Sequence, residues 1–485
     1  MKKINIYIWV LLASIMTACS DWLDVKPFDQ ADEEQQYSQA QGFYNQLNGI
    51  YRKMASPELY GQELTWGFMD VLAQYYDMTN YSPCKNYNYR NLAKLDYEQP
   101  RVKAYFKKFW ETTYNAIANC NNLIQFISVA DSTLFPLRER ERQCIEGEAR
   151  ALRGLLHFDL LRMFAPAPGV DSTGKYIPYV DYFPTHITQT MATNELLGKI
   201  MEDLAEGHRL TMSFDTLYVG NISNRANFLE LKRGGDINRF MNFRGYRLNH
   251  YAIKGMLARV SLYRGNKAVA LKWANDVYGY ITKKWFRFTT ESDIKYEKNM
   301  KLYGDVLFAL YNNNLTLYES KANDGVSQLA AWDYDGLFAG DNTRDFRRYQ
   351  WYEDKGNRYW AAHKYKEVDK SYDYGEYSNP MIPVLRCSEI CYIIAECSYE
   401  SNKAYAESIL NYVRKSRGCR STLEQSNSLG EFIQLIQKDY RREFYGEGQL
   451  FYFYKRLGLD AVGDGRNLIK YGQKFVFPIP ESEDI

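Results

Sequence analysis

The sequence predicts an all-α fold, mostly α with minor β, that is built from tetratricopeptide-like helix pairs. Three observations favour this fold class. Apolar residues recur at helical spacing over several long stretches, an eight-residue pattern recurs at two turns between predicted helices, and the segment between these turns contains one strand-like run. Stacked helix pairs bury their faces against one another, so a chain of 485 residues can form one large core in this way.

The N-terminus has the features of an export signal. Lys2 and Lys3 precede a mostly apolar run over residues 4–16, which is shorter than the about 20 residues that span a bilayer. Met16-Thr17-Ala18-Cys19 then resembles the lipobox of bacterial lipoproteins, in which the chain is cut before the cysteine and the cysteine is lipidated. We therefore expect a signal peptide over residues 1–18 and a lipidated tether over residues 19–37. The acyl chains on Cys19 would hold the protein at a membrane surface.

The first half of the chain contains four long helix predictions. Apolar positions at helical spacing predict helices over residues 38–54, 102–127, 138–164 and 194–210. Pro166 and Pro168 follow the third helix directly and end it, because proline cannot continue a helix. Between the first two helices, residues 66–100 interleave tyrosines with Asp and Asn around a Ser-Pro, and this pattern indicates a loop.

A helix pair is predicted over residues 247–263 and 267–280, and its turn has a counterpart further along the chain. Residues 263–270 and 399–406 are identical at five of eight positions, and each octet joins two predicted helices. The small alanines recur where neighbouring helices must approach closely, which favours true repeats. Convergent turn chemistry is the alternative, because Gly-Asn and Ser-Asn both suit a break between helices.

Between the octets, residues 286–383 show no sustained periodicity. Asp305–Tyr311 is a strand-like run, and many Trp and Tyr residues follow it among Asp, Asn and Gly. A long irregular segment inside a globular protein is usually functional or disordered. So many aromatic residues argue against disorder.

The composition excludes several classes of function. Removal of the signal peptide leaves 59 basic and 59 acidic residues, so the charge gives no reason to expect nucleic acid or an anionic membrane surface as a partner. The seven cysteines besides Cys19 indicate no disulfide framework, and Cys387 and Cys391, one helical turn apart, are interpreted as core residues. Five dispersed histidines and the lack of nucleotide-binding or metalloprotease motifs predict no cofactor and no metal.

Several motifs spread over the chain together resemble the SusD/RagB family of outer-membrane lipoproteins in Bacteroidetes glycan-uptake systems. Their order and spacing carry the resemblance, and they are Cys19–Asp24, Glu148–Arg153, Tyr263–Ala270, Asp341–Asp345 running on to Lys364-Tyr365, Pro383–Glu389, Asn411–Arg414, Arg441–Gly448 and Phe477–Pro480. The resemblance implies a single domain over residues 38–485, whose loop-rich half binds the ligand through an irregular segment at about 286–383. It also implies an external position on the outer membrane and a SusC-like TonB-dependent transporter as partner.

Candidate ligand residues lie in the two aromatic-rich segments. Sugar recognition uses flat rings that stack on a pyranose and planar amide or carboxylate groups that bind its hydroxyls. We therefore predict glycan contacts from Asp77, Asn80 and Tyr81 in the first segment and from Trp332, Tyr334 and Trp351 in the second. The alternative for each ring is packing within its own loop.

Two other patterns invite different chemistry. Glu443 and Glu447 are four apart on one predicted helix and share a face, as an acid/base pair would, but the resemblance favours a structural role in which buried arginines pair with acids. Trp332-Asp333-Tyr334-Asp335-Gly336 has carboxylates at the spacing of a calcium loop, but it lacks the twelfth-position glutamate of an EF-hand, which favours a plain turn.

These observations together predict a non-catalytic lipoprotein on the cell exterior that captures an oligosaccharide and delivers it to its transporter. Two alternatives remain open: a peptide-binding uptake lipoprotein of the RagB type, and a surface glycosidase that uses a carboxylate pair. The mixed composition of the two loops does not decide between sugar and peptide. The sequence also leaves open the glycan, its linkage, the individual transporter and the redox state of the cysteines.

Overall fold

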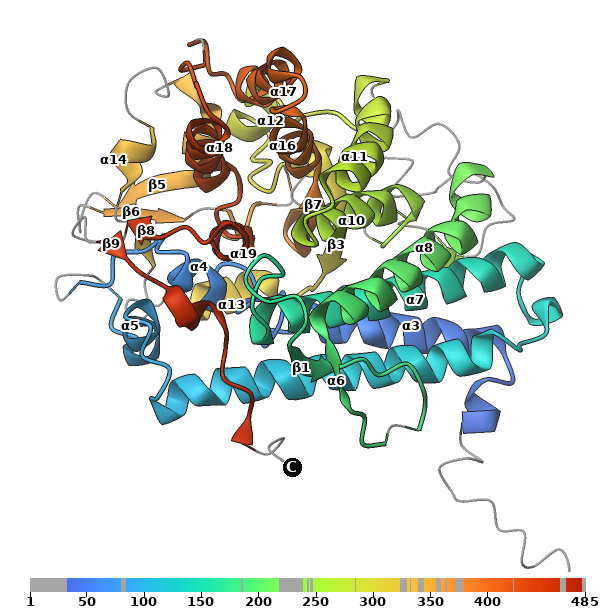
Figure 1. Cartoon of the computed structure of the whole chain (residues 1–485). Coiled ribbons are helices and arrows are strands. Elements are labelled where there is room, and N and C mark those ends of the chain that lie inside the picture. Colours follow the sequence, from blue (N-terminus) through green and yellow to red (C-terminus); the bar gives the residue numbers. More distant parts are fainter. Residues whose placement is uncertain are drawn as a thin grey trace, which may run out of the picture.

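Long helices form one side of the molecule and small sheets with irregular segments form the other (Figure 1). The computed structural model describes residues 33–481 except for 80–83, 185, 218–238, 242–243, 245–246, 284, 323–328, 332, 339–343, 355–358, 363, 370, 372–377, 422 and 463–467. Within this part, one cluster of buried apolar side chains runs from Tyr37 to Phe477. None of the helices there combines the length and the apolar character that crossing a bilayer requires.

The helices of the N-terminal half agree with the predicted pattern. They are α3 (Ala40–Met54), α4 (Phe68–Leu72), α5 (Tyr87–Ala93), α6 (Pro100–Ile127), α7 (Arg138–Phe164) and α8 (Thr193–Leu217). The long helices α3, α6, α7 and α8 lie side by side (Figure 1). Two glycines allow α7 and α8 to approach closely, because a Cβ on Gly207 would lie 2.7 Å from the carbonyl oxygen of Gly147.

The C-terminal half continues the stack of helix pairs. Its helices are α10 (His250–Tyr263), α11 (Lys267–Thr282), α12 (Glu291–Lys295), α13 (Leu315–Ala322), α14 (Tyr334–Leu337), α16 (Cys387–Ser398), α17 (Lys403–Ser416), α18 (Leu429–Glu443) and α19 (Gln449–Leu457). Helix α8 packs on α10, α10 on α11, α11 on α16 and α16 on α17. The prediction of stacked helix pairs is therefore confirmed.

The two repeated octets form equivalent turns in adjacent pairs. Asn266 caps α11 by accepting a hydrogen bond from the Val269 N–H at 3.1 Å, and Asn402 caps α17 by accepting one from the Tyr405 N–H at 3.1 Å. The turns also contact each other, because Lys267 Nζ lies 2.8 Å from Glu400 Oε2. This geometry favours true repeats over a coincidence of turn residues.

Strands contribute four small antiparallel sheets in the described part of the chain. They pair β1 (Lys175–Pro178) with β2 (Thr190–Ala192), β3 (Val306–Tyr311) with β7 (Met381–Arg386), β4 (Ala330–Ala331) and β5 (Trp351–Asp354) with a central β6 (Tyr359–Ala362), and β8 (Ala461–Val462) with β9 (Leu468–Ile469). The predicted strand at 305–311 is β3. Strand β7 runs directly into α16, which fixes Arg386 at the junction.

One loop prediction needs correction. Residues 66–100 contain the short helices α4 and α5. Several aromatic rings in this range are buried rather than exposed to solvent. Asn86 begins α5 by accepting hydrogen bonds from the N–H groups of Asn88 and Tyr89. Helix α4 is buried at all of its five residues, so its apolar run has no polar face and gives no helical periodicity to detect.

Candidate ligand-binding site

The two segments predicted to bind ligand meet at the three-stranded sheet, which lies beside α14 in Figure 1. Tyr76 forms an isolated antiparallel bridge with Ala331 of the edge strand β4. Asp77 directly follows Tyr76 in the sequence. The second aromatic segment continues from Ala331, on the opposite strand of the bridge. Three predicted residues, Asn80, Tyr81 and Trp332, lie outside the described residues.

Asp77 begins the first loop after the bridge. Its Oδ1 accepts a hydrogen bond from the Thr79 N–H at 2.9 Å, which closes a tight turn. The side chain is half-buried. On the far side of the loop, Arg90 of α5 donates to the backbone carbonyls of Cys84 and Thr79 at 2.9 Å each. Both ends of the loop are thus attached to the scaffold.

Tyr334 and Trp351 lie close together but are covered by protein, at 6% and 5% exposure. Their ring centroids are 6.3 Å apart, and the Trp351 ring also lies 3.9 Å from the ring of Tyr445. Burial raises the pKa of the Tyr334 hydroxyl. These two rings therefore pack inside the second segment, which was the alternative to ligand contact.

The same layer of rings extends to the first segment. Tyr445 contacts Tyr75 and Tyr76 at centroid distances of 5.5 and 6.0 Å. The Tyr75 hydroxyl donates to the Arg441 carbonyl at 2.9 Å and the Tyr76 hydroxyl to the Trp66 carbonyl at 2.7 Å. Tyr75 and Tyr76, which are not among the predicted ligand residues, therefore pack in the core.

Glu443 lies beneath this layer in a fully buried network of charges. It accepts hydrogen bonds from Arg347 at 2.8 Å, from Arg386 at 2.5 Å and from Arg417 at 2.6 Å. Burial opposes ionisation of the carboxyl group, but Arg417, Arg386 and Arg347 outweigh it and hold the pKa of Glu443 well below its usual value. Glu443 is an anion in the folded protein and holds no proton to donate.

The prediction that Glu443 and Glu447 share one helix is wrong, because α18 ends at Glu443 and Glu447 lies in the turn before α19. Glu447 nevertheless belongs to the same network and is paired as well. It accepts a hydrogen bond from Arg386 Nε at 2.9 Å and forms an ion pair with Lys364. Two buried carboxylates that are both neutralised by cations cannot act as a general acid and a base or nucleophile, because that chemistry needs one protonated group and access to substrate. The structural interpretation of the 441–448 motif is confirmed.

The network connects to the predicted ligand loop through Asp70 of α4. Asp70 accepts hydrogen bonds from the N–H groups of Gly446 and Gly448 at 2.6 and 3.2 Å, and burial raises its pKa well above the usual value. Gly448 needs to be glycine here, because its φ is +67° and a Cβ would lie 2.0 Å from the Leu64 carbonyl oxygen. The turn between α18 and α19 thus holds the helix that precedes Tyr76 and Asp77.

Sequence reasoning found part of this network and missed the rest. Asp345, Lys364, Arg386, Glu443 and Glu447 all fall in motifs that carried the family resemblance. Their partners Asp70 and Arg417 do not. The local sequence does not predict a role for these two residues, because their partners are distant in the sequence.

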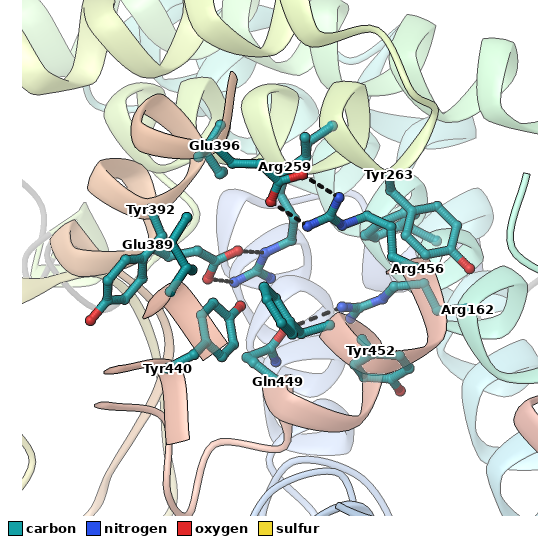
Figure 2. A pocket seen from close by; sticks show the side chains of 15 residues that line it. Arg162, Arg259, Tyr263, Glu389, Tyr392, Glu396, Tyr440, Gln449, Tyr452 and Arg456 are labelled. Carbon is teal, nitrogen blue, oxygen red and sulfur yellow. Dashed lines mark hydrogen bonds and ion pairs between the residues drawn. The ribbon is translucent and has the colours of Figure 1, made fainter. Parts of the chain in front are cut away.

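A second ionic cluster lines a small pocket between α7, α10, α16, α18 and α19 (Figure 2). Arg259 pairs with Glu389 through two hydrogen bonds of 2.6 Å, and Arg456 pairs with Glu396 in the same way. The volume is about 50 Å³, which holds a few water molecules but no sugar ring. This pocket is therefore no candidate for an oligosaccharide site.

The described residues offer no group of three or more His, Cys, Asp or Glu side chains that could hold a metal. Within the acidic motif of residues 332–336, Tyr334 begins the short helix α14 (Tyr334–Leu337). Seven cysteines of this part are free and buried. Cys387 and Cys391 pack in the core of α16, as predicted.

Two protein-family models match most of the chain. A model described as "Starch-binding associating with outer membrane" matches residues 21–219, and a model described as "SusD family" matches residues 310–474. The comparison with curated proteins finds no match.

Solved structures show the same fold at low identity. A putative sugar binding protein from Bacteroides vulgatus is 20% identical with a TM-score of 0.69, over 92% of this chain and 96% of that one. A SusD-like carbohydrate binding protein from the same organism is 17% identical with a TM-score of 0.70 and the same coverage. Surface glycan-binding protein A from Bacteroides thetaiotaomicron is 15% identical with a TM-score of 0.62, over 92% and 97% of the two chains.

Proposed function

Because this chain belongs to the SusD/RagB family, we propose that it is a cell-surface lipoprotein that binds an oligosaccharide and delivers it to a SusC-like TonB-dependent transporter. One matching family model is described as starch-binding, and a similar solved structure is a surface glycan-binding protein, which supports a binding role without catalysis. The ionic pairing of Glu443 and Glu447 supports binding without hydrolysis, since neither carboxylate is available to a substrate.

The observation that carries the proposal is the meeting of the two aromatic segments. The bridge between Tyr76 and Ala331 brings together loops from opposite halves of the chain, and both loops are rich in rings, amides and carboxylates. Loops on a rigid scaffold are the usual position of binding residues. We propose Asp77, Asn80, Tyr81 and Trp332 as direct ligand contacts, and Tyr334 and Trp351 as buried rings that support the second segment.

The anchor and the partner belong to the same proposal. Lipid on Cys19 and the following tether would place the domain of residues 38–485 outside the outer membrane, and the continuous core from Tyr37 to Phe477 supports treating these residues as one domain. The stacked helix pairs would provide the rigid face that contacts the transporter. Metabolic labelling with a fatty acid, compared between the native chain and Cys19→Ala, tests the anchor.

Calorimetric titration of the full chain in detergent tests the ligand. We expect saturable binding of one neutral hexasaccharide from a panel of malto-, cello-, xylo- and mannohexaose, with micromolar to millimolar affinity. Tyr81→Ala and Trp332→Ala should each weaken binding at least about tenfold, since each removes a stacking ring. Val129→Ala, at an exposed position just beyond the C-terminal end of α6 and outside both aromatic-rich segments, is the control and should bind normally.

Binding of a peptide digest without any glycan would contradict the sugar assignment and favour the peptide-binding alternative. Release of shorter sugars during the titration would contradict a purely binding role.

A further inference from the structure

A large open cleft lies on the helical side of the molecule, away from the sheet that carries the proposed ligand loops. It is formed by the chain that leaves α7, by the end of α19 and by residues 472–478, the red segment that runs toward the C-terminus in Figure 1. Its volume is about 880 Å³, within the range of about 300–1,000 Å³ typical of ligand sites. None of the residues predicted from the sequence to bind ligand lines it.

Two half-buried rings stand in this cleft and are held in place by their neighbours. The Tyr176 hydroxyl donates to Asp171 Oδ2 at 2.7 Å. Phe475 stacks on Tyr471 with a centroid distance of 4.5 Å and an angle of 23°. Because both rings are fixed before a ligand arrives, little side-chain entropy is lost on binding.

Hydrogen bonds to the backbone also hold the floor of the cleft in place. The Tyr97 hydroxyl donates to the Lys474 carbonyl at 2.8 Å. The buried amine of Lys455 donates to the Arg162 carbonyl at 2.6 Å, at the end of α7. Two glycines at the rim leave the backbone accessible, because a Cβ on Gly458 or Gly472 would meet nothing within 4 Å.

The charges around the cleft do not select a charged ligand. Lys455 offers no free charge to the cleft, because its buried amine donates to backbone carbonyls and burial lowers its pKa well below the usual value. Asp171 is held by Tyr176 and Glu98 by Lys103, which leaves Asp460 and Lys474 with opposite charges. Rings beside mixed donors and acceptors instead suit an uncharged molecule with an apolar face and many hydroxyls, which is the chemistry of a neutral sugar chain.

We propose that this cleft is a second binding site for a neutral oligosaccharide, separate from the site at the loops. The inference rests on the proposed function, since it takes the same class of ligand. Two sites on one protein retain a long polysaccharide more strongly than either site alone, because the second contact forms within one complex.

Stoichiometry tests the proposal. The full chain in detergent is titrated with malto-, cello-, xylo- and mannohexaose, and we expect the hexasaccharide that binds to occupy two sites. Tyr176→Ala should weaken one of the two sites by about fivefold to tenfold and leave the other unchanged. Val129→Ala is the control, because Val129 is 82% exposed just beyond the C-terminal end of α6 and lies outside both the cleft and the two aromatic-rich segments.

A second variant guards against a folding defect in Tyr176→Ala. Gln473 is exposed at the rim, so Gln473→Cys labelled with a bulky maleimide should block the cleft without disturbing the core. The seven described native cysteines are buried and should not react. Val129→Cys with the same label should keep both sites, because Val129 is exposed and lies outside both of them.

The outcomes separate this inference from the proposed function. A single site that survives both cleft variants and disappears in Trp332→Ala would overturn the second site and leave the proposed function in place. Absence of saturable binding by any of the four hexasaccharides would overturn both. Peptide binding that the Gln473 label blocks would overturn the sugar assignment of the cleft.

Discussion

At the scale of single residues, the buried acids of this protein fall into two groups that behave differently. Glu443 is surrounded by three arginines, whereas Glu63 accepts only neutral donors: the Phe68 N–H at 3.0 Å and the Tyr89 hydroxyl at 3.1 Å. Burial raises the pKa of Glu63 to about 7, since no cation compensates for the lost hydration. Glu443 therefore stays ionised, while Glu63 gains a proton near neutral pH.

We predict that Glu63 makes the folded state less stable as the pH rises. Between pH 4.5 and 7, Glu63 retains a proton in the folded protein that it has already released in the unfolded chain. The contribution of Glu63 to the free energy of unfolding therefore falls through this window and is constant above it. The total loss is about 3 kcal/mol. Glu63→Gln should remove it, which urea denaturation at pH 4.5, 5.5, 6.5 and 7.5 measures.

The control for this prediction is Glu98→Gln, whose side chain is 76% exposed. It should follow the pH dependence of the unmodified protein. If Glu63→Gln followed that dependence too, Glu63 would already be ionised in the folded state at low pH, and the role given to its burial would be wrong.

At the scale of elements, the two repeated turns show how short sequence patterns position helices. In both turns an asparagine begins the second helix and an alanine four residues later is fully buried, at Ala270 and Ala406. The asparagine satisfies an N–H that has no partner within the helix. The small alanine lets neighbouring helices approach, so the same octet can serve two adjacent pairs.

We predict that Asn402→Ala lowers the free energy of unfolding by about 1 kcal/mol, the usual cost of losing an N-cap. Asn266→Ala should have a similar effect, because its hydrogen bond has the same length. Asn402→Asp keeps the acceptor oxygen and should stay close to the unmodified protein. Chemical denaturation of the three variants measures this, and an equal loss in Asn402→Asp would show that something other than the cap is responsible.

At the scale of the whole molecule, the two ends of the chain are interlocked. The Phe477 N–H donates to the Met163 carbonyl at 3.0 Å, and the Phe477 ring packs against Phe68 and Phe106 of the N-terminal half. The Tyr471 hydroxyl donates to the Leu72 carbonyl at 2.5 Å. Opening the C-terminal segment therefore exposes the core of the N-terminal half, and we expect the protein to unfold as one unit.

Buried thiols throughout the chain report this cooperative unfolding. All seven described cysteines are free and buried. Burial raises the pKa of the Cys397 and Cys419 thiols to about 12, which keeps the reactive thiolate scarce. We predict that a thiol-reactive dye labels none of them in the folded protein and that a reductant leaves the Tm unchanged. A fall in Tm with reductant would indicate a disulfide and contradict the structure.

The sequence by itself determined the helices, the repeated turns and the family. These are local or periodic properties. The spacing of apolar residues predicts a helix, and each octet turn contains the asparagine that caps the following helix. The same reasoning selected the two segments that we propose to bind ligand, because their excess of aromatic and amide side chains is visible without any contact. It gave the strand at 305–311 for the same reason, as an uninterrupted apolar run bounded by polar residues.

Only the tertiary structure decided which side chains meet. Arg259 pairs with Glu389 across 130 positions, and Gly446 donates to Asp70 across 376, distances at which no sequence pattern connects two residues. It also showed that Tyr75 and Tyr76, in a segment expected to be a loop, are core residues, and that α4 is a helix with no exposed face. A ring is buried or exposed to a ligand according to which distant segments of the chain cover it, and only the fold determines those contacts.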